Sequence, residues 1–194
     1  MPNSEENAII SEKIAALLEI FDADPALWVS LSAVAQNPQN KLLVSTPFVG
    51  VGSAHAIEAA QLGRSAIEQG SIETTKRQKH FMARGAKWRF LRVFDRRVER
   101  STDIPANRFV SYFVRKSIQT LKHYASIIPN YDLDYDYLPA FLYIIRRLNA
   151  IYDSIEPAMR RATLLTLPLD DQVLNFDPKY RRILNAYLAL DALV

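Results

Sequence analysis

The sequence contains no cysteine, which excludes disulfide bonds, thiolate nucleophiles and cysteine-ligated metal sites. Its three histidines, His55, His80 and His123, are too far apart to form an HxxxH or HExxH zinc motif. No apolar run reaches the roughly 20 residues of a membrane-spanning helix. Residues 1–30 carry glutamates on a helical pattern instead of the basic start of a signal peptide. These absences predict a soluble, cytoplasmic chain with no membrane partner, metal or cofactor.

Motifs for nucleotide or calcium binding are incomplete. The stretch GVGSAH (50–55) follows a strand-like run, as a phosphate-binding loop would, but His55 takes the third glycine position. A turn with Ser53 as the N-cap of a helix explains it better. The stretch DLDYD (132–136) has alternating aspartates, yet Tyr137 and Tyr143 stand where a calcium loop needs glycine and glutamate. A solvated acidic loop is the simpler interpretation.

A degenerate metal-dependent nuclease centre is an alternative that the sequence leaves open. Asp177, Pro178 and Lys179 imitate the (D/E)xK element of such nucleases, with Asp170 and Asp171 upstream. That element belongs on a paired strand, and Pro178 cannot donate a ladder hydrogen bond. Asp-Pro is also a common helix start, so these residues have a structural explanation without chemistry. No GxSxG elbow marks a serine nucleophile either.

The hydrophobic periodicity predicts a mainly α protein, a helical bundle with a small β element in the middle of the chain. Apolar residues recur every three or four positions over 4–21, 25–36, 105–128 and 138–155, and again after Asp177-Pro178. The run 42–52 is strand-like but broken by Pro47, which predicts an edge strand or two short pieces. Aromatic and β-branched residues favour a strand over 87–100, and 71–80 reads as an exposed connection.

Charge is distributed very unevenly along the chain. Residues 1–75 contain 3 basic and 9 acidic side chains, residues 76–125 contain 14 and 3, and residues 126–194 contain 7 and 9. This asymmetry predicts an acidic helical part over 1–75 and a part over 76–194 that combines a basic strand-like segment with a C-terminal helical bundle. We expect the two parts to pack together as one compact domain. The asymmetry also indicates a polyanionic or acidic partner.

The basic segment is the main candidate binding site, because arginines suit phosphate oxygens and its interleaved aromatics offer stacking surfaces for bases. Equally, these cations could be a solvated face or pair with the acidic N-terminal third. The candidate residues are Lys76, Arg77, Lys79, Arg84, Lys87, Arg89, Arg92, Arg96, Arg97 and Arg100.

The segment STDIPANRFVSYFVRKSIQTL (101–121) starts a helix with Asn107-Arg108 in its first turn, where acids would suit the helix dipole better. About seventy residues later comes VLNFDPKYRRILNAYLAL (173–190). Together they resemble the helical region ahead of the nuclease domain in McrC-like restriction proteins, whose motifs read approximately D-T-P-E-N-R-F-[LV]-K and YRxVL. The matching residues are Asp103, Pro105, Asn107, Arg108, Phe109, Val110, Tyr180, Arg181, Ile183 and Leu184, while Ala106 and Ser111 replace the usual Glu and Lys.

The resemblance implies a non-catalytic module of a restriction or antiviral defence system, which binds DNA or docks onto an AAA+ NTPase or nuclease subunit. The PD-(D/E)XK nuclease domain of that family has no counterpart in this sequence. Asp103, Pro105, Asn107 and Arg108 are then expected to lock the junction between the strand and the helix. A structural protein–protein adaptor is the remaining alternative, with an exposed apolar patch on the C-terminal helices. The oligomeric state is left open.

Overall fold

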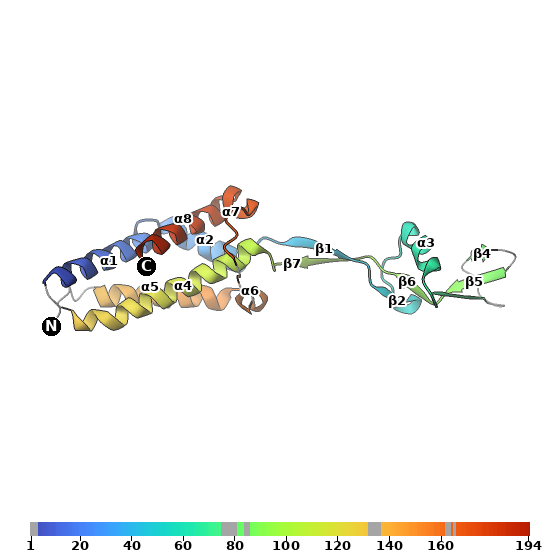
Figure 1. The fold of residues 1–194 in the computed structure, drawn as a ribbon, viewed down its shortest axis with the longest axis horizontal. Helices are drawn as coiled ribbons and strands as arrows, with labels where there is room; N and C mark the ends of the chain where they lie inside the picture. Colours follow the sequence, from blue (N-terminus) through green and yellow to red (C-terminus); the bar gives the residue numbers. More distant parts are fainter. Residues whose placement is uncertain (1–3, 75–80, 84–85, 132–136, 162–163, 165) are drawn as a thin grey trace. The chain divides into compact units, whose positions relative to one another are not determined.

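The structure is a computed structural model that describes residues 4–74, 81–83, 86–131, 137–161, 164 and 166–194. The chain forms two compact units (Figure 1). The helical unit contains residues Met1–Asn40 and Thr102–Val194, and the inserted unit contains Lys41–Ser101. The predicted fold class is confirmed, since long helices dominate and the short antiparallel strands all lie in the middle of the chain.

The helical unit is built from long helices that lie side by side in Figure 1. The long helices are α1 (Ser4–Asp22), α2 (Pro25–Gln36), α4 (Pro105–Ile127), α5 (Tyr137–Ser154) and α8 (Pro178–Leu193), with the short α6 (Pro157–Arg161), α7 (Gln172–Phe176) and 3-10 turn η2 (Ile128–Asn130) between them. Helix α4 packs on α5, α6 and α8, and α2 packs on α8 and α5. No described helix is long and apolar enough to cross a bilayer.

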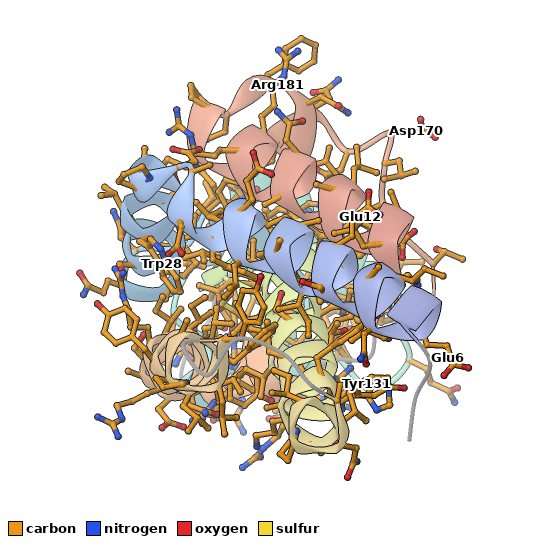
Figure 2. All side chains as sticks on the ribbon, turned by 90° about the vertical axis from the view of Figure 1, so that its left-hand side faces the viewer. Glu6, Glu12, Trp28, Tyr131, Asp170 and Arg181 are labelled. Atoms are coloured by element: carbon orange, nitrogen blue, oxygen red, sulfur yellow. The ribbon has the colours of Figure 1, made fainter. Side chains whose placement is uncertain are left out.

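One hydrophobic core holds these helices together. Its largest fully buried side chains are Phe21, Phe109, Phe113, Phe141 and Tyr180, which come from α1, α4, α5 and α8. Every residue of this core belongs to the helical unit. Acidic side chains stay outside it, as Glu6 and Glu12 do on α1 in Figure 2. Burial of one apolar face of each helix, at about 25 cal/mol per Å², is therefore the main stabilising term of this unit.

Aspartate caps define where several of these helices begin. The Asp24 carboxylate accepts a hydrogen bond from the Ala26 N–H at 3.0 Å, and Pro25 is the first residue of α2. The Asp177 carboxylate accepts from the Lys179 N–H at 2.9 Å, and Pro178 opens α8 in the same way. Such caps satisfy amide groups that have no partner inside the helix. The predicted Asp-Pro helix starts are thus explained by local chemistry.

The inserted unit is a set of short antiparallel strands, β1 (Lys41–Ser45), β2 (Phe48–Gly50), β3 (Ile72–Thr74), β4 (Phe81–Ala83), β5 (Ala86–Phe90), β6 (Arg92–Phe94) and β7 (Arg97–Ser101). It also contains the 3-10 turn η1 (Val51–Ser53) and helix α3 (Ala59–Ile67). The pairing is nested: β1 pairs with β7, β2 with β6, and β3 with β5, which also pairs with β4. The inserted unit is therefore one long hairpin with α3 as an insertion.

Three details differ from the sequence expectations. Helix α3 begins at Ala59 after Glu58, and Ser53 ends a 3-10 turn instead of capping a helix. The run 87–100 forms parts of three strands, because the partner changes along it: β5 pairs with β3 and β4, β6 pairs with β2, and β7 pairs with β1. The two units divide at residues 40/41 and 101/102 and not at residue 75, because the strands around 42–50 pair with those around 92–101.

Candidate nucleic-acid interface

The structure describes the side chains of five of the ten candidate cations, and all five belong to the inserted unit: Arg89, Arg92, Arg96, Arg97 and Arg100. Lys76, Arg77, Lys79 and Arg84 lie outside the described residues, and Lys87 is described only as a backbone position in β5. Four of the five described cations lie on the strands β5, β6 and β7, and Arg96 lies in the turn between β6 and β7.

Arg89 on β5 faces an acidic neighbour on β3. Glu73 is its direct cross-strand partner in the antiparallel register. The Arg89 guanidinium donates to the Glu73 carboxylate, and both side chains are more than a third exposed. Such an exposed pair contributes at most about 1 kcal/mol. Because its side chain is exposed and this pair is weak, Arg89 can exchange Glu73 for another acidic partner.

Arg92 lies over an aromatic pair. Its Nη2 donates to the Phe48 carbonyl at 2.8 Å, and its guanidinium carbon is 4.4 Å from the centroid of the Phe48 ring. Phe48 and Phe94 are register partners on β2 and β6, and their ring centroids are 4.9 Å apart. Arg64 of α3 lies over Phe94 at 4.3 Å from the centroid. Two cations and two rings thus fasten α3 and β2 to β6.

A buried carboxylate, Asp95, organises the turn between β6 and β7. It accepts hydrogen bonds from the backbone N–H groups of Ala56 at 2.8 Å and His55 at 3.0 Å, and from Arg97 Nε at 2.9 Å. These donors, the Ala56 amide foremost, lower the pKa of Asp95 below its ordinary value of 3.8. No local pattern in the sequence marks Asp95 as an anchor, because its amide partners lie about forty positions away in the chain.

Arg96 and Arg100 are exposed on either side of this anchor. Arg96 pairs with Glu58 at 2.6 Å, and both side chains are more than a third exposed. Arg100 is exposed and has no side-chain hydrogen bond or ion pair to any residue that the structure describes. Arg97 is the exception among these cations, since its partner Asp95 is fully buried. Arg97 therefore has a structural role, whereas Arg96 and Arg100 are accessible to a ligand.

The division into units also divides the charge. Residues 41–101 contain 12 basic and 5 acidic side chains, a net charge of +7. Residues 1–40 and 102–194 contain 12 basic and 16 acidic side chains, a net charge of −4. The overall charge of +3 thus comes from two units of opposite sign. A unit of about sixty residues with this excess attracts anions over roughly 8–10 Å at physiological salt.

Asn107 is buried in the first turn of α4, where it joins the two chain segments next to the insertion. Its Nδ2 donates to the carbonyl of Gln39 at 2.7 Å and to that of Thr102 at 2.6 Å. Its Oδ1 accepts from the Tyr180 hydroxyl, which in turn accepts from the Gln39 N–H at 3.0 Å. Burial raises the pKa of Tyr180 to about 12. The hydroxyl is thus held neutral as a donor, and one residue from each of the two quoted motifs meets in this network.

Arg108 points the other way, to Asp103 just before the helix. Arg108 Nε donates to Asp103 Oδ1 at 2.6 Å and Nη2 donates to Oδ2 at 2.7 Å, a two-pronged pair. The hydrogen bonds and charge of Arg108 lower the pKa of Asp103, and those of Asp103 raise the pKa of Arg108. An acid just before the helix thus offsets the cation in its first turn. Pro105 is the first residue of α4.

Two of the three carboxylates of the alternative nuclease centre, those of Asp171 and Asp177, serve as helix caps. Asp171 accepts from the N–H groups of Val173 and Leu174 at the start of α7, and Asp177 accepts from Lys179 N–H at the start of α8. Asp177 also accepts from Gln39 Nε2 at 3.2 Å. Within the part of the chain that the structure describes, no cluster of three or more His, Asp or Glu side chains could hold a metal. The aspartates of DLDYD lie outside that part.

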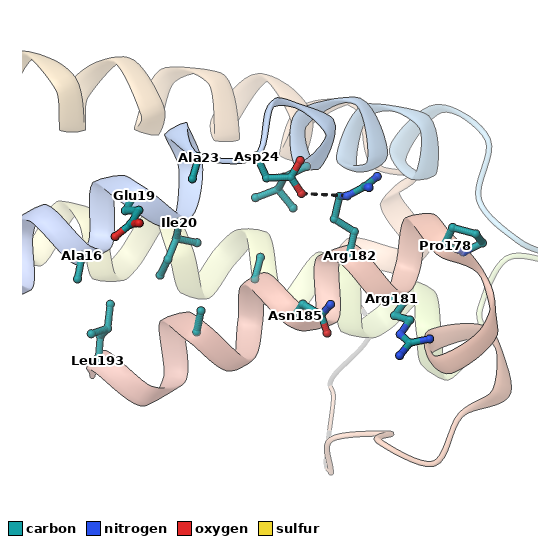
Figure 3. A pocket seen from close by; sticks show the side chains of 13 residues that line it. Ala16, Glu19, Ile20, Ala23, Asp24, Pro178, Arg181, Arg182, Asn185 and Leu193 are labelled. Carbon is teal, nitrogen blue, oxygen red and sulfur yellow. Dashed lines mark ion pairs between the residues drawn. The ribbon is translucent and has the colours of Figure 1, made fainter.

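The helical unit also has an open groove of about 640 Å³ between α1 and α8 (Figure 3). Its floor is formed by alanines, among them Ala16 and Ala23, and its rim carries Glu19, Arg181 and an ion pair between Asp24 and Arg182 at 2.9 Å. The rim thus carries charges of both signs, and two of them, Asp24 and Arg182, neutralise each other.

No protein-family model matches this chain, and no curated protein or solved structure is significantly similar to it. The resemblance to McrC-like proteins therefore rests on the motif residues alone.

Proposed function

We propose that this protein is a non-catalytic nucleic-acid-binding module and that the inserted unit, residues 41–101, makes the contact. The observation that carries the proposal is the separation of charge, +7 on the inserted unit against −4 on the helical unit. Phosphate neutralisation by such a basic element supplies most of non-specific nucleic-acid affinity. The acidic helical unit would repel the same ligand, so binding would be confined to the insertion.

The side chains of β5 to β7 support this assignment. Trp88 and Phe90 alternate with Arg89 along β5, so the aromatic side chains share one face of the strand and the arginine takes the other. Arg89 and Arg96 are held by exposed carboxylates in pairs of low energy, and a phosphate oxygen can replace either acid as acceptor. Arg100 contributes an accessible charge that no described acid neutralises.

The motifs around Asn107 and Tyr180 supply the biological setting of the proposal. Their similarity to McrC-like restriction proteins supports a cytoplasmic accessory role in restriction or antiviral defence, with catalysis in a nuclease or AAA+ NTPase partner. The network of Asn107, Tyr180 and Gln39 joins both motifs around the two ends of the insertion. The motifs would thus form the base of the nucleic-acid-binding element. The nuclease alternative receives no comparable support, because Asp171 and Asp177 cap helices.

Fluorescence anisotropy with single- and double-stranded DNA at several salt concentrations tests the proposal. The test variant replaces Arg89, Arg96 and Arg100 by Gln, and the control replaces Arg115, Arg146 and Arg181 of the helical unit, so both lose the same charge. Each lost phosphate contact should flatten the log–log salt slope by roughly 0.9 on duplex DNA. We expect this only in the test variant. Equal slopes in the two variants, or no salt-dependent binding at all, would contradict the proposal.

A further inference from the structure

Strand β1 exposes an unusual run of aliphatic side chains. Leu42, Leu43 and Val44 are consecutive and are 59%, 46% and 56% exposed. Val98 on β7, the register partner of Val44, is 52% exposed. A natural strand normally shields such residues, because an exposed aliphatic strand promotes association. This run therefore needs a physical explanation.

The alternation of the strand restricts what could cover these residues. Successive side chains of β1 point to opposite faces of the β1–β7 ribbon, so Leu42 and Val44 share one face and Leu43 occupies the other. A helix or a flat surface packed on the ribbon would cover one face only. A further strand beside β1 brings its own alternating side chains next to both faces. The exposure pattern thus fits an added strand.

The edge of β1 is open to such a strand. Among the described strands β1 pairs with β7 alone, so the backbone groups along its other edge have no ladder partner there. Between Lys41 and Ser45 no charge interrupts the edge, and Pro47 comes only after the strand has ended. The inserted unit also has little core of its own, with Val93 and Phe94 as its buried hydrophobic residues among those described. An added strand would extend that limited apolar packing.

Charge indicates the chemistry of the occupant. Lys41 and Arg97 share a face with Leu43 and with one acid, Glu99, and Arg100 shares the opposite face with Leu42 and Val44, so three of the four charges on the ribbon are positive. A second copy of β1 would bring another unit of net charge +7 next to the first. Nucleic acid would gain nothing from three aliphatic side chains. An aliphatic peptide with acidic residues matches both the side chains and the charge.

We propose that the free edge of β1 binds an extended segment of a partner protein that is aliphatic in its centre and acidic at its ends. The segment adds a strand to the β1–β7 ribbon, with its aliphatic side chains against Leu42, Leu43 and Val44 and an acid near Lys41. This site has only Arg100 in common with the cations of the nucleic-acid proposal, and its test is made at Leu43, so each proposal can fail without the other.

A fluorescein-labelled peptide EIVVLE with blocked ends is a suitable probe, with KIVVLK as the matched peptide of opposite charge. Anisotropy is measured with the wild-type protein, with Leu43→Lys, and with Ile67→Lys as a control for added charge on an 87% exposed aliphatic residue of α3. Circular dichroism confirms that each variant is folded. We expect binding of EIVVLE that is at least about tenfold weaker in Leu43→Lys and unchanged in Ile67→Lys, which corresponds to a loss of about 1.4 kcal/mol.

Hydrogen–deuterium exchange locates the contact, and it should slow in residues 41–45 when EIVVLE is added. The proposal is overturned if EIVVLE does not bind, if KIVVLK binds equally well, or if both lysine variants weaken binding alike. A concentration-dependent dimer that Leu43→Lys abolishes would also overturn it, because the edge would then be occupied by a second copy. DNA binding should be the same in Leu43→Lys and Ile67→Lys, which add the same charge to the inserted unit, and this separates the test from that of the nucleic-acid proposal.

Discussion

At the residue scale, burial distinguishes two neighbouring side chains in the first turn of α4. Asn107 is fully buried and uses both its amide hydrogens and its carbonyl oxygen. Arg108 forms a well-aligned pair with Asp103, but both side chains are more than a third exposed. A buried polar group that loses its partner costs the full desolvation penalty, whereas an exposed ion pair contributes little. Asn107 should therefore contribute more to the free energy of unfolding than its neighbour Arg108 does.

We expect Asn107→Ala to lower the free energy of unfolding by roughly 2–3 kcal/mol, because the Gln39 and Thr102 carbonyls and the Tyr180 hydroxyl lose partners. Arg108→Ala should cost less than about 1 kcal/mol. Urea unfolding followed by circular dichroism measures both. If Arg108→Ala were the more damaging change, the ion pair and not the buried amide would hold this junction.

The sequence indicated at this scale that Asn107 and Arg108 needed specific partners, because a cation in a first helical turn opposes the dipole. It could not identify Tyr180 or Gln39 as those partners, since they lie about seventy residues away in either direction. Asp95 escaped notice for the same reason, as a lone aspartate among arginines resembles any solvated acid. The neighbouring sequence thus indicates that a side chain needs a hydrogen-bond partner, but only the folded structure shows which distant residue that partner is.

At the element scale, β6 and the turn after it hold the inserted unit with polar contacts. The Ser65 hydroxyl of α3 accepts from the Phe94 N–H at 2.9 Å, and the Ser71 carbonyl accepts from the Leu91 N–H at 2.7 Å. Asp95 adds the bonds to Ala56 and His55. Among the residues that the structure describes, Val93 and Phe94 are the buried hydrophobic residues of the inserted unit. Polar hydrogen bonds therefore contribute a larger share of the stability of the inserted unit than they do in the helical unit.

Because the pKa of Asp95 is lower in the folded than in the unfolded state, its contribution to the free energy of unfolding is fully present above the unfolded value near 3.8 and is lost as the pH falls through the lower folded-state pKa. We expect the His55 and Ala56 amides to be protected from hydrogen exchange at pH 6 and to lose this protection only as the pH falls through the lowered pKa of Asp95, which lies below 3.8. Asp95→Asn should remove this protection already at pH 6. Glu58→Gln, which breaks only the exposed pair with Arg96, is the control and should leave it intact.

Element boundaries followed from the sequence wherever a local signal was strong. Helix α2 covers the predicted residues 25–36, and Pro47 separates β1 from β2 as expected. The start of α3 was misplaced by five residues, because Ser53 suggested a cap but ends a 3-10 turn, and the N-cap of α3 is Glu58. The region 71–80, expected as a connection, contains β3 at Ile72–Thr74, and 75–80 lie outside the described residues. Strand pairing over such distances leaves no local pattern.

At the scale of the whole molecule, the chain is a discontinuous helical unit interrupted by a continuous insertion. The core residues of the helical unit all come from its own two segments. Lys41 and Ser101 are register partners, so the ends of the insertion lie about 5 Å apart. The helical unit should therefore tolerate removal of the insertion.

We expect a variant in which a short Gly-Ser linker replaces residues 41–101 to fold and to melt cooperatively, with helical circular dichroism per residue above that of the full chain. It should no longer bind DNA, since the basic unit is gone. Thermal denaturation and anisotropy measure the two properties. A molten chain without a cooperative transition would show that the helical unit depends on the insertion for its stability.

The nested pairing of the insertion has a consequence for the order of events during synthesis. Helices α1 and α2 leave the ribosome first, yet α4, α5 and α8, against which they pack, follow only after Ser101. Bringing Asn40 and Thr102 together across a floppy loop of 61 residues would carry an entropic cost that grows with the logarithm of its length. Once β7 has paired with β1, the two segments are already adjacent. The β1–β7 pairing would then lower the entropic cost of bringing α1 and α2 to α4, α5 and α8, provided that it forms before these helices pack together.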